Sequence, residues 1–215
     1  MVKIPKGKFI FGINRKEYGD STKIENIKGF WIDKYPVTNE EYKKFIDDNP
    51  NILVPYIDEK WAMKYNWNIK KRTYPNQLKK HPVVMVKRKY ILQYCKWINK
   101  RLPTEIEWEK AARGINGFLY PWGNTWIDDR ANTKEYNIQG TTPVMLFKKF
   151  SSPFGVVDLI GNVWEWTSTP YEYSGFVVRG GSWQMNSNLV NCCSRSGLVE
   201  NYISSALGWR CVKDE

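Results

Sequence analysis

The sequence predicts a single α+β domain, with helices in its first half and short strands in its second. Its 215 residues suit one hydrophobic core. Apolar residues recur at helical spacing only before residue 115, and turn signals between short apolar runs fill the rest. We find no internal repeat, linker or low-complexity stretch, so one domain is expected to span residues 1–215.

Two strands are expected before the first helix. Residues 3–12 carry Ile4, Phe9 and Phe11 around a Pro-Lys-Gly turn, and residues 29–34 read GFWIDK. Apolar and aromatic runs bounded by turn residues are typical of β-strands.

Three helices are predicted, at residues 38–50, 88–99 and 104–114. The first and third open with Thr-x-x-Glu, the capping box in which each side chain satisfies the other residue's backbone N–H. All three place apolar side chains three or four residues apart, which gives each helix one buried stripe. Pro50 and Gly114 indicate where the first and third helices end.

The remaining segments lack helical spacing. Residues 51–80 are rich in Trp, Tyr and Lys without a clean period, and we interpret them as an ordered irregular loop with room for a short helix. Residues 81–84 are expected to be extended. Further short strands are expected at residues 143–147, 154–159, 161–167, 176–183 and 207–212.

The charge balance is strongly basic, with a formal net charge of +11. The lysines are scattered and form no nucleic-acid-binding motif, which leaves a solvated surface and an anionic partner both open. No stretch approaches the roughly 18 apolar residues of a transmembrane segment. The first residues lack the apolar core of a signal peptide, so a cytoplasmic protein or a component of a released particle is expected.

The four cysteines are Cys95, Cys192, Cys193 and Cys211. None shows the CxxC spacing of a zinc site, and a domain of this size does not need disulfides to fold. Cys95 falls within the second predicted helix, where a buried thiol packs as a small hydrophobe.

Seven segments, in order and at fitting separations, resemble the sulfatase-modifying-factor family, which includes the formylglycine-generating enzymes. They are Ile32–Asn39, His81–Val84, Arg101–Gly114, Tyr120–Asn124, Gly161–Trp166, Arg179–Trp183 and Gly208–Cys211. The resemblance covers almost the whole chain outside residues 51–80 and parts of 133–150. It implies a C-type lectin-like fold with short helices and small irregular antiparallel sheets, and tryptophans wedged into its core.

The resemblance also says which chemistry to look for. Formylglycine-generating enzymes bind copper through two cysteines that follow the Gly-Gly-Ser motif. Here the first position falls at or near Met185 and the second within residues 186–191, and neither holds cysteine. Cys192 and Cys193 come later, where the family places small packed residues. Iron-binding relatives use several histidines, whereas this chain has only His81, so we expect neither copper nor iron.

One metal is implied by the resemblance. The family often binds structural Ca²⁺ at the Gly-Asn-x-Trp-Glu-Trp loop, where Asn162 and Glu165 would supply oxygen ligands. The alternative is that Asn162 holds a turn and Glu165 pairs with a basic group. Asp128, Asp129 and Asp158 are candidates for carboxylate chemistry, although turn and cap roles also explain them.

The segment 184–207 lies between two fixed motifs and mixes small polar, aromatic and apolar residues, as binding loops do. Exposed apolar side chains on such a loop indicate contact with a partner. We expect side chains of 186–205 to be mostly exposed and grouped on one face, and Trp183 and Trp209 to be buried. The candidate contact residues are Gln184, Asn186, Asn188, Asn191, Cys192, Ser194, Ser196, Leu198, Val199, Asn201, Tyr202, Ile203 and Ser204.

This arrangement resembles the variable proteins of diversity-generating retroelements, which display a hypervariable C-terminal stretch on this fold. Those systems mutate adenines, so that Asn codons change to codons for other residues such as Ser, Tyr, Cys and Ile. Apart from Gln184, Met185 and Glu200, the residues of the stretch are compatible with such changes. The implied function is non-catalytic binding of a macromolecular or glycan ligand through the C-terminal loop surface. Drift in an ordinary family member and an oxidoreductase of the formylglycine or non-haem-iron kind remain the alternatives.

Overall fold

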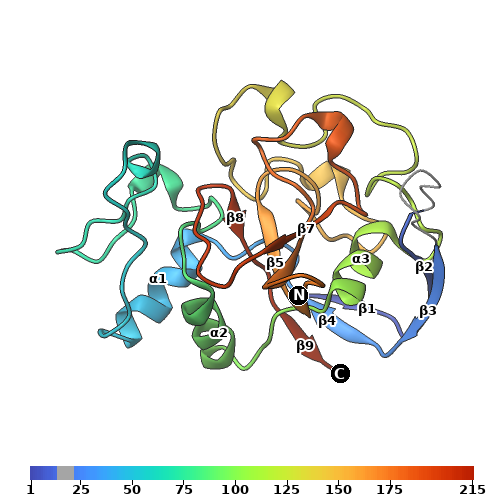
Figure 1. Ribbon diagram of the computed structural model, residues 1–215, viewed down its shortest axis with the longest axis horizontal. Coiled ribbons are helices and arrows are strands. Elements are labelled where there is room, and N and C mark those ends of the chain that lie inside the picture. Colours follow the sequence, from blue (N-terminus) through green and yellow to red (C-terminus); the bar gives the residue numbers. More distant parts are fainter. Residues whose placement is uncertain (14–21) are drawn as a thin grey trace.

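The computed structural model describes residues 1–13 and 22–215 and confirms the α+β class (Figure 1). The α-helices of this part are α1 (Asn39–Asp48), α2 (Arg88–Trp97) and α3 (Glu105–Arg113). The strands are β1 (Val2–Ile4), β2 (Gly7–Phe11), β3 (Lys23–Ile27), β4 (Phe30–Ile32), β5 (Trp164–Pro170), β6 (Phe176–Arg179), β7 (Arg195–Leu198), β8 (Leu207–Gly208) and β9 (Val212–Asp214). Single 3₁₀ turns are η2 (Lys60–Ala62), η3 (Asn76–Leu78), η4 (Lys134–Tyr136), η5 (Lys148–Phe150) and η6 (Ser187–Leu189).

Both predicted capping boxes are present. At the start of α1 the Thr38 hydroxyl accepts a hydrogen bond from the Glu41 N–H, and the Glu41 carboxylate accepts one from the Thr38 N–H at 2.8 Å. Thr104 and Glu107 repeat this arrangement at the start of α3. Because a capping box is local, these two helix starts could be read from the sequence.

The strands form three small sheets within the described residues, in the orders β1-β4-β9, β2-β3 and β7-β6-β5-β8. Neighbouring strands are antiparallel except β5 and β8, which are parallel. The first sheet joins the two ends of the chain, because Ile32 of β4 pairs with both Val2 and Val212. A salt bridge of 3.0 Å between Lys3 and Glu215 lies at the same place.

Two predicted strands are wrong. Residues 144–147 form turns, and residues 154–159 form an irregular run, with left-handed φ at Gly155 and Asp158, that joins no sheet. In the second case the Val157 N–H donates to the Lys34 carbonyl at 2.9 Å, and the run is apolar because it is buried in the core. A short apolar run indicates that the residues are buried, and a buried segment does not have to pair with a neighbouring strand.

Other strand boundaries also differ from the prediction. The run 3–12 is two strands, β1 and β2, separated at the predicted turn. The run 207–212 begins with the short strand β8 and reaches only the first residue of β9. The strand β3 was not predicted because its sequence, KIENI, is half polar. The strand β7 lies inside the segment that was predicted to be a loop.

The main core is built around aromatic rings. Tyr42 of α1 and Tyr94 of α2 each contact the Trp209 ring, with centroids 5.6 and 5.7 Å apart. Such edge-on packing of large rings supplies much of the buried apolar area of a domain. Cys95 and Cys211 are buried in the same cluster with their sulfur atoms 3.3 Å apart, so Cys95 packs as predicted.

Residues 51–80 form an ordered irregular lobe that projects at one end of the long axis (Figure 1, left), as predicted, with η2 and η3 as its only helical turns. Trp67 anchors the lobe, because its ring is buried and its Nε1 donates to the Asn39 side chain at 3.0 Å. The Arg72 guanidinium donates to carbonyls at the end of α1, including Ile46 at 3.1 Å. No helix in the described part of the chain is long and apolar enough to cross a membrane.

Candidate ligand-binding surface

A buried ionic network supports the start of the candidate segment. Arg179, at the end of β6, pairs with the carboxylates of Glu105 and Glu109 on α3, and Arg195 at the start of β7 pairs with Glu105 at 2.8 Å. Glu109 also pairs with Arg113 at 2.8 Å. The network joins β6 and β7 to one helix face, so the segment between them is held on a rigid base.

The backbone at the start of the segment approaches its neighbours too closely for a side chain. Gly180 and Gly181 have φ values of 92° and 75°. A Cβ atom on Gly180 would lie 2.6 Å from the Leu159 carbonyl oxygen. Glycine is therefore required at this entry point.

Met185 and Val190 both approach Gly181 at the start of the segment. A Cβ atom on Gly181 would collide with a Val190 methyl group and lie 3.5 Å from the Met185 sulfur. Val190 is buried and Met185 is half-buried. The family resemblance places a metal-binding cysteine pair at or near residue 185 and within 186–191. In this chain those positions include the apolar side chains of Met185 and Val190, which both approach Gly181.

The structure sorts the thirteen candidate contact residues into three groups. The exposed ones are Gln184, Asn186, Asn188, Val199, Asn201 and Tyr202. The half-buried ones are Ser194, Ser196, Leu198, Ile203 and Ser204. Asn191 and Cys192 are buried, so their assignment to an exposed surface is wrong.

Asn191 and Cys192 are buried because they complete the core beneath the turn. The Cys192 carbonyl accepts a hydrogen bond from Arg179 at 2.9 Å, and its N–H donates to the Leu119 carbonyl at 2.9 Å. Burial raises the pKa of the Cys192 thiol well above its usual value. The Asn191 side chain accepts the Cys193 N–H at 2.8 Å. The sequence could not predict these contacts, because they depend on the tertiary positions of Arg179 and Leu119.

The expectation that the side chains of 186–205 would be mostly exposed is wrong, because more of these residues are buried or half-buried than exposed. The exposed residues form two groups along the segment. The first surrounds η6, and the second is the turn after β7. In Figure 1 the orange-to-red chain passes from the helical turn of η6, through β7, to the loop beside β8. Exposed apolar side chains occur in both groups, with Leu189 at 53%, Val199 at 54% and Tyr202 at 44% exposure. Leu189 was not among the predicted contact residues, although its position in the same segment could have indicated it.

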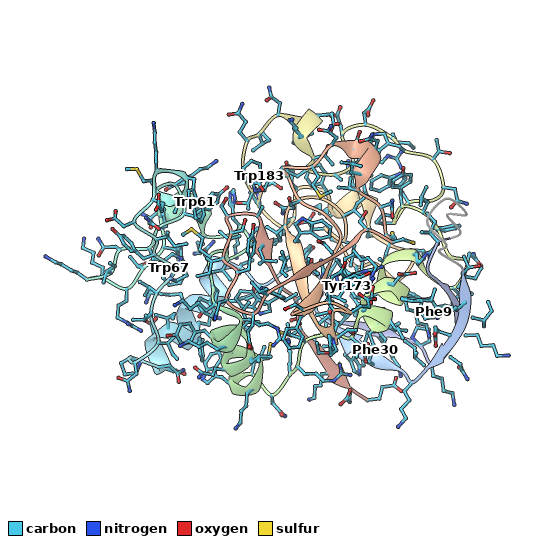
Figure 2. The ribbon with its side chains drawn as sticks, viewed as in Figure 1. Phe9, Phe30, Trp61, Trp67, Tyr173 and Trp183 are labelled. Atoms are coloured by element: carbon cyan, nitrogen blue, oxygen red, sulfur yellow. The ribbon has the colours of Figure 1, made fainter. Side chains whose placement is uncertain are left out.

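Trp183 precedes both groups in the chain and is not the fully buried core residue that was predicted. Its ring is only half-buried, and its Nε1 donates to the Ser205 carbonyl at 3.3 Å. Figure 2 labels it among the side chains of this region. The prediction for Trp209 is confirmed, because its ring is fully buried. Trp183 therefore ties the two ends of the segment together near the surface.

The half-buried residues have structural contacts as well as exposure. Leu198 packs against the main core, and Ile203 packs against a smaller cluster that includes Tyr65 and Met85. The Ser194 hydroxyl donates to the Leu189 carbonyl at 2.9 Å. Changes at these positions are expected to affect stability as well as binding.

The side-chain oxygens of Asn162 and Glu165 are both engaged by protein groups. Asn162 has a φ of 57° and holds a turn, because its side-chain oxygen accepts the Thr142 N–H at 3.0 Å and its amide donates to Asp158 at 3.4 Å. The Glu165 carboxylate accepts bonds of 2.7 Å from Trp108 and from Arg210.

A cation at Glu165 would therefore have to displace a guanidinium group from a buried site, so the residues do not fit Ca²⁺ as they stand. Among residues 1–13 and 22–215, no three His, Cys, Asp or Glu side chains gather as they would around a metal ion. His81 contacts Thr141 at 2.9 Å, and burial lowers its pKa.

The fold consists of short helices and small sheets that hold a long, partly exposed C-terminal segment. It is a C-type lectin-like fold of the formylglycine-generating-enzyme type. The sulfatase-modifying factor enzyme 1-like domain matches residues 1–215, and the chain belongs to that family.

Its relatives differ in activity. The chain is 29% identical over 267 residues to the inactive C-alpha-formylglycine-generating enzyme 2 of Mus musculus, covering 99% of this chain and 85% of that protein. It is 28% identical over 280 residues to the formylglycine-generating enzyme of Mus musculus, covering 100% of this chain and 75% of that protein. The structure of Treponema denticola variable protein 1 shares the fold, with a TM-score of 0.78, 19% identity and coverage of 100% and 95% of the two chains.

Proposed function

We propose that this chain is a non-catalytic binding protein that contacts a macromolecular or glycan ligand through the exposed part of residues 184–204. The observation that carries the proposal is the pair Met185 and Val190, whose apolar side chains converge on Gly181. A copper site of the family's kind needs thiolates, and neither side chain can supply one. The segment around them nevertheless stays well ordered by hydrogen bonds.

The exposed groups have the composition of a binding surface. Asn186, Asn188 and Asn201 offer adaptable amide donors and acceptors, and Tyr202 offers a large ring with few rotatable bonds. The ionic network below the segment and the Trp183–Ser205 contact hold both groups in place. A surface that is ordered before binding loses less entropy when the ligand arrives.

The similarity to an inactive relative and to a variable protein agrees with this proposal. We further propose that the segment is diversified by a retroelement, as the sequence resemblance implies. The genomic neighbourhood tests this finer proposal: a reverse-transcriptase gene and a near-copy of the stretch encoding residues 179–211 are expected. An ordinary neighbourhood without either would contradict diversification and leave the binding proposal standing.

The binding proposal is tested by an array of glycans and surface proteins, with the purified chain as the probe. Tyr202→Ala should reduce binding of any hit at least tenfold, as loss of an aromatic hot spot does. Tyr56→Ala is the matched control, because both tyrosines are 44% exposed and Tyr56 lies outside the segment. Equal effects of the two variants would contradict the proposed surface.

A catalytic assay tests the alternative. Protein loaded with Cu(I) or Fe(II) should not convert a cysteine-containing sulfatase peptide to formylglycine. Turnover above a metal-only control would overturn the non-catalytic proposal.

A further inference from the structure

The lobe of residues 51–80 carries a second exposed surface that the proposed function does not use. Two of its turns present apolar side chains to solvent. The first includes Trp61 and Met63, which are 48% and 70% exposed, and the second includes Ile69, which is 56% exposed. We call residues 60–71 the lobe surface. Exposed aromatic and aliphatic side chains this close together in the chain indicate a contact surface.

Lysines flank these apolar side chains. Lys60 and Lys64 belong to the first turn, and Lys70 and Lys71 belong to the second; all four are exposed. Within the described residues no carboxylate lies at ion-pair distance from any of them, whereas Lys79 and Lys80 of the same lobe both pair with Glu40. The Lys64 ammonium lies over the Tyr65 ring and against Gly140, outside the lobe. The charges of Lys60, Lys70 and Lys71 are therefore the ones available to a partner.

The two turns are held in shape by their own hydrogen bonds. The Asn66 side chain donates to the Ile57 carbonyl at 2.8 Å and accepts the Ile57 N–H at 2.9 Å. The second turn is closed by backbone bonds between Asn68 and Thr73, and the Asn68 side chain accepts the Lys71 N–H at 2.8 Å. The apolar side chains are thus displayed by ordered backbone.

The lobe lies at one end of the molecule, away from the sheets (Figure 1), and Figure 2 labels Trp61 and Trp67 within it. A projecting turn can enter the interfacial layer of a bilayer without moving the rest of the domain. Trp favours that layer because its ring is apolar and its N–H is polar, and lysines beside it reach the phosphates.

We propose that the lobe surface docks onto a bilayer of anionic phospholipid. Met63 and Ile69 favour lipid over nucleic acid, because an aliphatic side chain offers no ring for a base to stack on, whereas it gains free energy in acyl chains. Lys60, Lys70 and Lys71 would each add electrostatic attraction to an anionic bilayer, so the three together strengthen the binding.

The test measures co-sedimentation with phosphatidylcholine vesicles that contain or lack phosphatidylglycerol. The full chain should bind the anionic vesicles, and salt should weaken the binding. Lys70→Glu with Lys71→Glu should lower the partition coefficient at least tenfold. Lys23→Glu with Lys213→Glu is the matched control, because it makes the same charge change on exposed residues of β3 and β9, outside the lobe.

Insertion is tested separately from charge. Brominated lipid should quench part of the tryptophan fluorescence, and Trp61→Phe should reduce that quenching. Met63→Ser with Ile69→Ser should weaken vesicle binding while the salt dependence stays unchanged.

Three results would overturn the proposal. The first is no preference for anionic vesicles, and the second is an equal loss of vesicle binding in the two lysine double variants. The third is no vesicle binding together with binding of labelled single-stranded RNA or an acidic polypeptide that depends on Lys70 and Lys71. None of these results bears on the proposed function of residues 184–204.

Discussion

Arg210 and Glu165 form two parallel hydrogen bonds in the interior, from Nε to Oε2 and from Nη2 to Oε1, each 2.7 Å long. Both side chains are almost completely buried. The same guanidinium donates to the carbonyls of Asp33 at 3.1 Å and Val157 at 2.8 Å. One side chain therefore connects β5, the segment after β4 and the unpaired core run before β5, three parts of the chain that no single sheet joins.

Arg210→Met should be strongly destabilising. It leaves the Glu165 carboxylate buried without its cationic partner, which costs about 3–5 kcal/mol in comparable cases. Chemical denaturation of variant and wild type gives the free energy of unfolding. Lys43→Met is the control, because Lys43 pairs with Asp47 at the surface and its loss should cost less than about 1 kcal/mol. Similar costs for both variants would contradict the structural importance of the buried pair.

Chelation should leave the melting temperature unchanged. The sequence led us to expect Ca²⁺ at Asn162 and Glu165, but the oxygens of Glu165 are used by Arg210 and Trp108. Thermal unfolding with EDTA and with added Ca²⁺ decides between the two expectations. A calcium-dependent rise in melting temperature that Glu165→Ala abolishes would restore the calcium site, since a ligand that binds the native state stabilises it.

Asp158→Asn should change how stability depends on pH. Burial raises the pKa of Asp158 from 3.8 to about 7, although the nearby Arg210 opposes this shift. The native state therefore holds the proton more tightly than the unfolded state, so this residue's contribution to stability is present below about pH 4 and is lost as pH rises to about 7.

Asn cannot titrate, and it tolerates the φ of 56° at this position. The difference in unfolding free energy between the variant and wild type should therefore move in favour of the variant from pH 4 to pH 8, measured by urea denaturation. A difference that stays constant across this range would show that Asp158 keeps an ordinary pKa.

Single substitutions in the candidate segment should follow the burial of each side chain. Asn188→Ala and Tyr202→Ala should cost less than about 1 kcal/mol, because both side chains are exposed. Leu198→Ala should cost more than either, because Leu198 packs against the core. Trp209→Ala should cost about 3–5 kcal/mol, as large core truncations do, and Trp183→Ala less. Denaturant midpoints measure the series, and a large cost at Asn188 or Tyr202 would show that the segment is structural throughout.

The family and the fold class were readable from local sequence, and so were the two capping boxes. Thr38 with Glu41, and Thr104 with Glu107, need only four residues to form. The sequence also predicted that residues 51–80 form an ordered segment without regular secondary structure. Each capping box is determined by contacts between near neighbours in the chain, which a sequence displays directly. The lobe is anchored instead by distant contacts, from Trp67 to Asn39 and from Arg72 to Ile46.

Only the tertiary structure decided which residues of the candidate segment face solvent. Asn191 and Cys192 looked like surface residues, but in the fold both are buried, and Cys192 packs in one cluster with α3 and donates to the Leu119 carbonyl. Trp183 looked like a core residue, but its ring is half-exposed and its Nε1 donates to the Ser205 carbonyl. Burial in this fold depends on contacts between residues far apart in the sequence, because short strands and long loops bury side chains without the regular spacing that a helix or a long strand would show.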